Sequence, residues 1–204
     1  VTAPGLGKAA GIAALNGRNL SAAASIQDCR FDGSISCGGN TAYGAMMGGI
    51  TAYSAGSQTL IKNCYAEADI TYTGTGADVI VSAAVICGYP NALTLQANVA
   101  GEGSIEFPSN VTTANVGRIY GLYNTSYHVK TGDNLANETI SFNGSPIVSE
   151  DSARDQATNG TGVTADELSQ QETYTEIGWD FRDCWKMGTD NRPELKEPGA
   201  LTLE

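Results

Sequence analysis

The chain has 204 residues, enough for one sizeable domain or for one piece of a solenoid. Its 22 acidic and 11 basic residues give a net charge of −11, which argues against nucleic acid or an anionic membrane as a partner. No apolar run approaches the roughly 20 residues of a membrane span, so we expect no membrane insertion. The apolar content of 41% is ordinary and predicts a folded protein.

A repeat of about 35 residues runs through the first two thirds of the chain. Isoleucine recurs at this spacing, a cysteine or an aromatic residue follows two positions later, and a small carboxylate or carboxamide stands seven positions earlier. The three columns are Ile35, Ile70, Ile105 and Ile140; Cys37, Tyr72, Phe107 and Phe142; and Asp28, Asn63, Asn98 and Asp133. Chance rarely keeps three columns through four copies, so we interpret residues 1–144 as a repeat architecture.

Each copy contains three short candidate strands separated by Gly, Ser and Asn. In the second copy these strands are Gly49–Tyr53, Thr59–Ala66 and Asp69–Thr73. Along the last of them, Ile70 and Tyr72 alternate with polar residues, and a period of two is typical of a strand. The repeat therefore predicts an all-β protein, a right-handed parallel β-helix of about four three-strand coils.

Stacking the coils assigns a place to each column. The isoleucine and aromatic columns become ladders inside the tube. The Asp/Asn column is expected to bond backbone groups at a turn, and the alternative is a catalytic or metal-binding row.

The five cysteines lack the C-x-x-C spacing of a zinc site or a redox dithiol, so we expect no metal and no cofactor. They are Cys29, Cys37, Cys64, Cys87 and Cys184. Buried free thiols are the main interpretation. Because Cys29 and Cys64 stand one repeat apart, a disulfide between neighbouring coils is the alternative. His128 is the single histidine, which excludes a site with several histidines.

Residues 145–204 leave the repeat and are interpreted as part of the same structural domain. A polar excursion comes first, and the spacing of Thr164 and Glu167 then predicts a short helix with a capping box. Residues 164–196 contain both tryptophans and are expected to form a C-terminal cap over the open end of the stack. From Glu150 onward the chain carries 13 of its 22 acidic residues.

Candidate site residues are few, and all lie in this last part of the chain. Trp179 and Trp185 are interpreted as cap residues, and the functional alternative is an aromatic platform that binds carbohydrate. Asp180, Asp183 and Asp190 offer oxygen ligands for calcium, although their spacing matches no calcium loop.

Two parts of the sequence resemble a known repeat family. Gly49-Ile50-Thr51-Ala52-Tyr53 and Asn63-Cys64-Tyr65-Ala66 resemble the repeat units of GLUG-type proteins, which are secreted or surface proteins of bacteria. Gly178-Trp179-Asp180-Phe181 and Arg192-Pro193-Glu194-Leu195 resemble the usual close of that family. The resemblance implies a right-handed β-helix of pectin-lyase-like architecture outside the cell, often within a longer adhesin-like protein. It brings no catalytic residues.

The sequence therefore predicts a non-enzymatic module, extracellular or at the cell surface, that presents a binding face or acts as a stiff spacer. Its expected partners are extracellular glycans or host matrix proteins. The alternative is a polysaccharide lyase or glycoside hydrolase that uses carboxylates on an outer face, such as Asp69 and Glu106. Lyase chemistry on acidic sugars requires cations that stabilise the developing charge. No row of Arg or Lys accompanies these acids.

Overall fold

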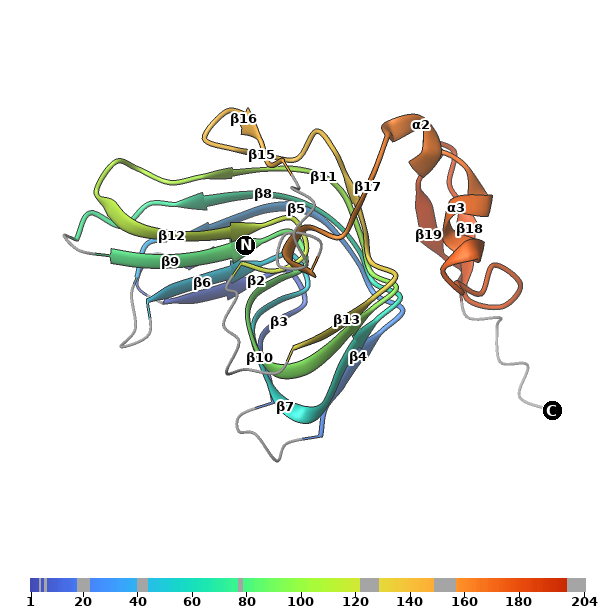
Figure 1. Cartoon of the computed structure of the whole chain (residues 1–204), viewed down its shortest axis with the longest axis horizontal. Coiled ribbons are helices and arrows are strands. Elements are labelled where there is room, and N and C mark those ends of the chain that lie inside the picture. Colours follow the sequence, from blue (N-terminus) through green and yellow to red (C-terminus); the bar gives the residue numbers. More distant parts are fainter. Residues whose placement is uncertain are drawn as a thin grey trace.

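The computed structural model describes residues 1–3, 5, 7–17, 23–39, 44–76, 79–121, 129–148 and 157–197. In this part of the chain, most elements are β-strands in three parallel sheets, and each coil passes through the three sheets in turn (Figure 1). The predicted parallel β-helix is therefore confirmed. None of the described helices is long and apolar enough to span a membrane.

Every coil contributes one set of strands to the three sheets. Sheet A contains, in order, β1 (Thr2–Ala3), β5 (Arg30–Cys37), β8 (Tyr65–Tyr72), β11 (Val99–Glu106), β14 (Leu135–Asn137) and β17 (Thr161–Val163). Sheet B contains β2 (Lys8–Ala10), β6 (Ala45–Gly48), β9 (Val79–Ala84) and β12 (Val111–Gly117). Sheet C contains β3 (Ala13–Asn16), β4 (Ser25–Gln27), β7 (Thr51–Lys62), β10 (Cys87–Gln96) and β13 (Lys130–Gly132).

The isoleucine ladder fills the interior behind sheet A. Ile35, Ile70 and Ile105 are direct neighbours in the register of β5, β8 and β11, and each is almost fully buried. In the fourth coil the partner of Ile105 is Phe142, two residues beyond the predicted Ile140. Ile140 is buried elsewhere in the core. The fourth copy of the column was therefore wrongly placed.

One extra residue between Ala136 and Ser141 contributes to this shift, and a hairpin follows it. Strand β15 (Ser141–Phe142) pairs with β11 and also turns back antiparallel onto β16 (Ser145–Pro146). Asn143 and Gly144 make the two-residue turn with φ of 46° and 76°, which is the conformation that an Asn-Gly pair adopts most readily. Phe142 then packs edge-on against Phe107, with the ring centroids 5.2 Å apart.

The predicted Asp/Asn column lies at the turn between sheets C and A. Asp28, Asn63 and Asp133 adopt left-handed backbone there, with φ between 49° and 54°, which Asp and Asn tolerate better than most residues. The third coil departs from this pattern, because Ala97 occupies the turn with φ 52° and Asn98 follows it. This coil is one residue shorter than predicted, and an irregularity in β11 between Ala100 and Gly103 restores the register.

Asn98 instead belongs to a ladder of amides inside the tube. Its Nδ2 donates to the carbonyl of Ile61 and to Oδ1 of Asn134, both at 3.0 Å. Nδ2 of Asn134 in turn donates to the carbonyl of Leu95 at 2.9 Å. These buried amides hydrogen-bond the backbone, as predicted for the Asp/Asn column. They lie one position after the turn residues of that column.

All five cysteines are free thiols. Cys37, Cys64 and Cys87 are buried in the core, as predicted. Cys29 and Cys184 are only partly buried.

The C-terminal segment, residues 164–196, contains α2 (Ala165–Leu168), α3 (Gln171–Glu176) and the antiparallel pair β18 (Trp185–Met187) and β19 (Pro193–Leu195). The capping box is confirmed: the backbone N–H of Glu167 donates to Oγ1 of Thr164 at 3.2 Å, and the Thr164 N–H donates to the Glu167 carboxylate at 2.7 Å.

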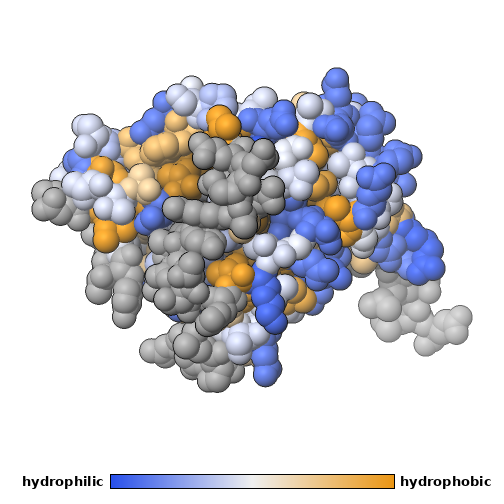
Figure 2. All heavy atoms as spheres, viewed as in Figure 1, coloured by the Kyte–Doolittle hydropathy of each residue, from blue (hydrophilic) through white to orange (hydrophobic). Residues whose placement is uncertain are grey.

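This segment packs along the side of the coils and does not cover the open end of the stack (Figure 1). The reason is a column of outward apolar residues at the start of sheet A, formed by Tyr65, Val99 and Leu135 in register. These side chains form one cluster with Trp179 and Trp185. The face of the segment seen in Figure 2 is mostly hydrophilic, so its apolar side is turned toward the coils.

Candidate binding groove on sheet A

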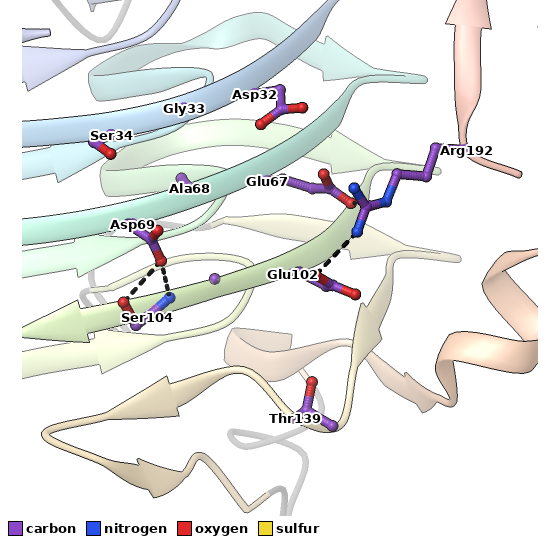
Figure 3. A pocket seen from close by; sticks show the side chains of 11 residues that line it. Asp32, Gly33, Ser34, Glu67, Ala68, Asp69, Glu102, Ser104, Thr139 and Arg192 are labelled. Carbon is purple, nitrogen blue, oxygen red and sulfur yellow. Dashed lines mark hydrogen bonds and ion pairs between the residues drawn. The ribbon is translucent and has the colours of Figure 1, made fainter. Parts of the chain in front are cut away.

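A groove of about 440 Å³ lies on the outer face of sheet A, beside the C-terminal segment (Figure 3). We call it the acidic groove. Three successive coils line it with residues 32–34 of β5, 67–69 of β8 and 102–104 of β11, and Thr139 and Arg192 complete it. The lining is therefore the same stretch of the repeat, presented three times.

The register of the sheet brings the carboxylates together. Asp32 is the direct partner of Glu67, and Glu102 lies in the irregular part of β11 beside it. Gly103 is required at this irregularity: its φ is 158°, and a β-carbon there would collide with the carbonyl oxygen of Ala68.

Arg192 closes one side of the groove. Its Nε lies 2.9 Å from Oε1 of Glu67, and its Nη2 lies 3.0 Å from Oε2 of Glu102. The hydroxyl of Tyr65 donates to the same Oε1 of Glu67 at 2.6 Å. One guanidinium therefore joins two coils to the C-terminal segment.

Burial governs the charge state of this cluster. Glu67 is only 7% exposed, and burial raises the pKa of its carboxyl although Tyr65 and Arg192 oppose the shift. Burial, followed by the charge of Glu67, raises the pKa of the Tyr65 hydroxyl. Burial alone would lower the pKa of Arg192, but Glu67 and Glu102 together raise it. Arg192 therefore stays charged.

The open side of the groove presents hydrogen-bond acceptors. Oδ1 of Asp69 accepts from the backbone N–H of Ser104 at 3.1 Å and from its hydroxyl at 2.8 Å, which fixes the carboxylate on the sheet surface (Figure 3). More than half of the Asp32 and Glu102 side chains is exposed. Oδ2 of Asp32 lies 3.6 Å from Arg30, and Oε2 of Glu102 pairs with Arg192, so the second oxygen of each carboxylate and Oδ2 of Asp69 are left for a ligand. Glu106 is exposed on the same strand as Glu102 but lies outside the groove.

Trp179 and Trp185, the candidate carbohydrate-binding residues, lie in the core of the C-terminal segment. Trp179 is 4% and Trp185 0% exposed, and their rings are 4.3 Å apart. The indole N–H of Trp179 donates to the carbonyl of Ala97 at 2.8 Å, and that of Trp185 donates to Asp28 at 3.3 Å. Neither ring presents a face on which a sugar could stack.

The three aspartates considered for calcium are separately engaged. Oδ1 of Asp180 accepts from the backbone N–H groups of Arg182 and Asp183, and Asp183 pairs with the Arg182 guanidinium. Asp190 accepts from the N–H of Arg192 at 3.1 Å. Within the described ranges, no three His, Cys, Asp or Glu side chains form a group that could hold a metal ion. His128 lies outside the described residues.

The acidic row itself was not predicted. Asp32, Glu67 and Glu102 recur at the 35-residue spacing of the repeat, so the signal was present in the sequence. Asp69 and Glu106, the outer carboxylates that the sequence analysis named, fall in different positions of the sheet. Arg192 has no counterpart in the repeat, and no local pattern places it here.

No family model and no curated protein matches the chain. A solved structure does share the fold: the crystal structure of a putative immunoglobulin A1 protease from Bacteroides ovatus, with a TM-score of 0.67 and 22% sequence identity. The match covers 96% of this chain and 55% of that chain, so this chain spans about half the length of its neighbour. At this identity, the likeness shows the β-solenoid fold alone.

Proposed function

We propose that this chain is a non-enzymatic, adhesin-like binding module of a secreted or surface protein of bacteria, and that the acidic groove contacts a neutral glycan. The observation that carries the proposal is the groove of about 440 Å³, in which carboxylates and hydroxyls from three successive coils face outward. A row of fixed polar groups along a stiff solenoid suits an extended ligand.

The chemistry of the groove selects the class of glycan. Carboxylates such as Asp69 and Glu102 accept hydrogen bonds only, and the hydroxyls of a neutral sugar donate them. Four carboxylates face one guanidinium, and the chain carries a net charge of −11, so acidic polysaccharides are repelled. Neutral sugars and amino sugars therefore fit best.

The proposed location outside the cell is supported by the resemblance of Asn63-Cys64-Tyr65-Ala66 and the C-terminal segment to GLUG-type proteins. The longer solenoid neighbour from Bacteroides ovatus is in keeping with a module of a longer protein.

A glycoside hydrolase or polysaccharide lyase at the same groove is the alternative. Glycosidase chemistry needs one carboxyl free to protonate the leaving group and a second across the cleft, about 5 to 10 Å away. Glu67 has the raised pKa of such an acid, but its Oε1 is held by both Tyr65 and Arg192. This arrangement favours a structural role for Glu67 and binding by the exposed carboxylates.

A glycan array followed by titration calorimetry tests the proposal. We expect binding to neutral or amino-sugar glycans and none to polygalacturonate. The double variant Asp69→Asn with Glu102→Gln should weaken binding about tenfold or more, since charge-assisted hydrogen bonds are lost.

Glu106→Gln is the matched control, because it removes a carboxylate from the same strand outside the groove. Equal affinities for both variants, or a preference for acidic glycans, would contradict the proposed contact site. Release of reducing or unsaturated sugars that ends in the double variant would favour the enzyme.

A further inference from the structure

Cys29 and Cys64 occupy the same position in the first two coils. Each directly precedes a strand of sheet A, and the ladder continues with Arg30 opposite Tyr65. The backbone N–H of Tyr65 donates to the carbonyl of Cys29 at 2.9 Å, so the two cysteines are neighbours across the ladder. Adjacent strands lie about 4.8 Å apart, which falls within the Cα separations of about 4.4–6.8 Å that a disulfide spans.

The two thiols also point the same way. Each donates to the carbonyl two residues earlier, Cys29 to Gln27 at 3.2 Å and Cys64 to Lys62 at 3.3 Å. The Cys64 sulfur also lies 3.7 Å from the carbonyl oxygen of Ile26 in the first coil. It therefore faces the coil that carries Cys29.

The same column shows what a bond here would add. In coils three and four this position holds Asn98 and Asn134, whose amides join one coil to the next. The Asn98 amide also accepts from the backbone N–H of Cys64 at 3.2 Å, which joins coil two to coil three. Between coils one and two, this position offers two thiols in place of an amide.

Cys29 differs from the other four cysteines in the direction of its pKa shift. The hydrogen bond from Cys64 lowers the pKa of Cys29 to about 7, against the opposing effects of burial and of Asp28. Burial raises the pKa of Cys37, Cys87 and Cys184. Cys29 is also only partly buried, so a small oxidant reaches a sulfur that is often ionised.

We propose that Cys29 and Cys64 are a site of reversible oxidation, at which a small peroxide converts the two thiols into a disulfide that joins the first coil to the second. The Cys29 thiolate attacks one oxygen of hydrogen peroxide, and the O–O bond breaks. Hydroxide is the leaving group, and Cys29 becomes a sulfenic acid. The Cys64 sulfur then attacks the Cys29 sulfur, the S–O bond breaks, and the oxygen departs as water with the proton of Cys64. In sum, two thiols and one peroxide give one disulfide and two waters.

Cys64 reacts in the second step as a thiol. The pKa of Cys64 is raised, first through its hydrogen bond to Cys29 and then through burial. Its proton therefore stays on the sulfur until it leaves with the oxygen of Cys29 as water.

Peptide mapping of the whole chain under non-reducing conditions tests the site. After mild peroxide treatment, we expect a peptide in which Cys29 is linked to Cys64, a loss of two hydrogen atoms from the chain mass, and recovery of both thiols with dithiothreitol. The midpoint of thermal unfolding should rise by several degrees on oxidation and fall again on reduction.

Cys29→Ser should abolish the cross-link and the rise in midpoint, whereas the control Cys184→Ser should keep both. The mapping itself needs no variant, so a poorly folded Cys64→Ser protein would not prevent the test. Oxidation of Cys29 to sulfenic or sulfinic acid without a link to Cys64, or a link through Cys184, would overturn the proposal.

Discussion

The guanidinium of Arg192 lies 2.9 Å from the carboxylate of Glu67, although the chain completes two further coils between them. Glu67 belongs to β8 in the second coil and is almost fully buried. A second contact, at 3.0 Å, joins the same guanidinium to Glu102 in the third coil. The C-terminal segment is thus fixed to the coils by charge as well as by its tryptophans.

The first prediction concerns this ion pair. Arg192→Ala leaves the buried carboxylate of Glu67 with Tyr65 as its remaining partner, so we expect a loss of about 1–3 kcal/mol in the free energy of unfolding. Urea unfolding at neutral pH measures this loss. The control is Arg182→Ala, which breaks an exposed pair with Asp183 in the same segment and should leave stability unchanged. Equal stability of all three proteins would show that the pair with Glu67 contributes nothing.

The second prediction concerns the pH dependence of stability. The pKa of Glu67 is raised above its ordinary value of 4.5, so the folded protein binds this proton more tightly than the unfolded chain does. The stability that comes from this protonation is present below the unfolded pKa and is lost as the pH rises through the folded pKa. The Glu67→Gln variant has no titrating group at this position, so it cannot lose this contribution to stability. The variant should therefore gain stability relative to the wild type as the pH is raised from about 4 to about 8.

Urea unfolding of both proteins at several pH values gives this difference. Glu106→Gln is a suitable control, since it removes an exposed carboxylate from the neighbouring strand. A difference between wild type and Glu67→Gln that falls with rising pH would show that the folded protein prefers Glu67 ionised.

The sequence predicted the sheets well because the repeat constrains them. Ile35, Ile70 and Ile105 follow from a constant spacing and a period of two, and both reflect stacking in register. What the spacing could not reveal were compensating irregularities. The third coil is one residue short before Asn98 and recovers at Gly103, so columns on either side still appear to be 35 residues apart.

The site was harder to predict because Arg192, which closes one side of it, lies outside the repeat. Asp32, Glu67 and Glu102 obey the repeat and were recoverable from it. The position of Arg192 depends on how the C-terminal segment packs, and this packing follows from the outward column of Tyr65 and its neighbours. An apolar column on the outer face of a sheet predicts that another segment of the protein covers it, but does not identify that segment.

The third prediction tests the amide ladder. Asn98→Leu keeps the branched shape of the side chain in a somewhat larger one, but leaves the Cys64 N–H and the Ile61 carbonyl without their partner in a buried site. We expect a loss of about 2–4 kcal/mol in the free energy of unfolding. The control is Asp133→Asn, which keeps a residue that tolerates the left-handed turn and should change stability by less than about 0.5 kcal/mol. A tolerated Asn98→Leu would mean that the ladder is dispensable.

The fourth prediction separates a structural role of Trp179 from a role in binding. Its ring packs against Trp185 at 4.3 Å, and its N–H bonds the Ala97 carbonyl, so Trp179→Ala should cost about 3–5 kcal/mol. Trp179→Phe keeps most of the packing but loses the hydrogen bond, about 1 kcal/mol. Because the ring does not reach the surface, the phenylalanine variant should bind glycans with unchanged affinity at temperatures where it is folded. Calorimetric titration measures the affinity for the glycan, and urea unfolding measures the stability. Weakened binding at unchanged stability would show that Trp179 contacts the ligand.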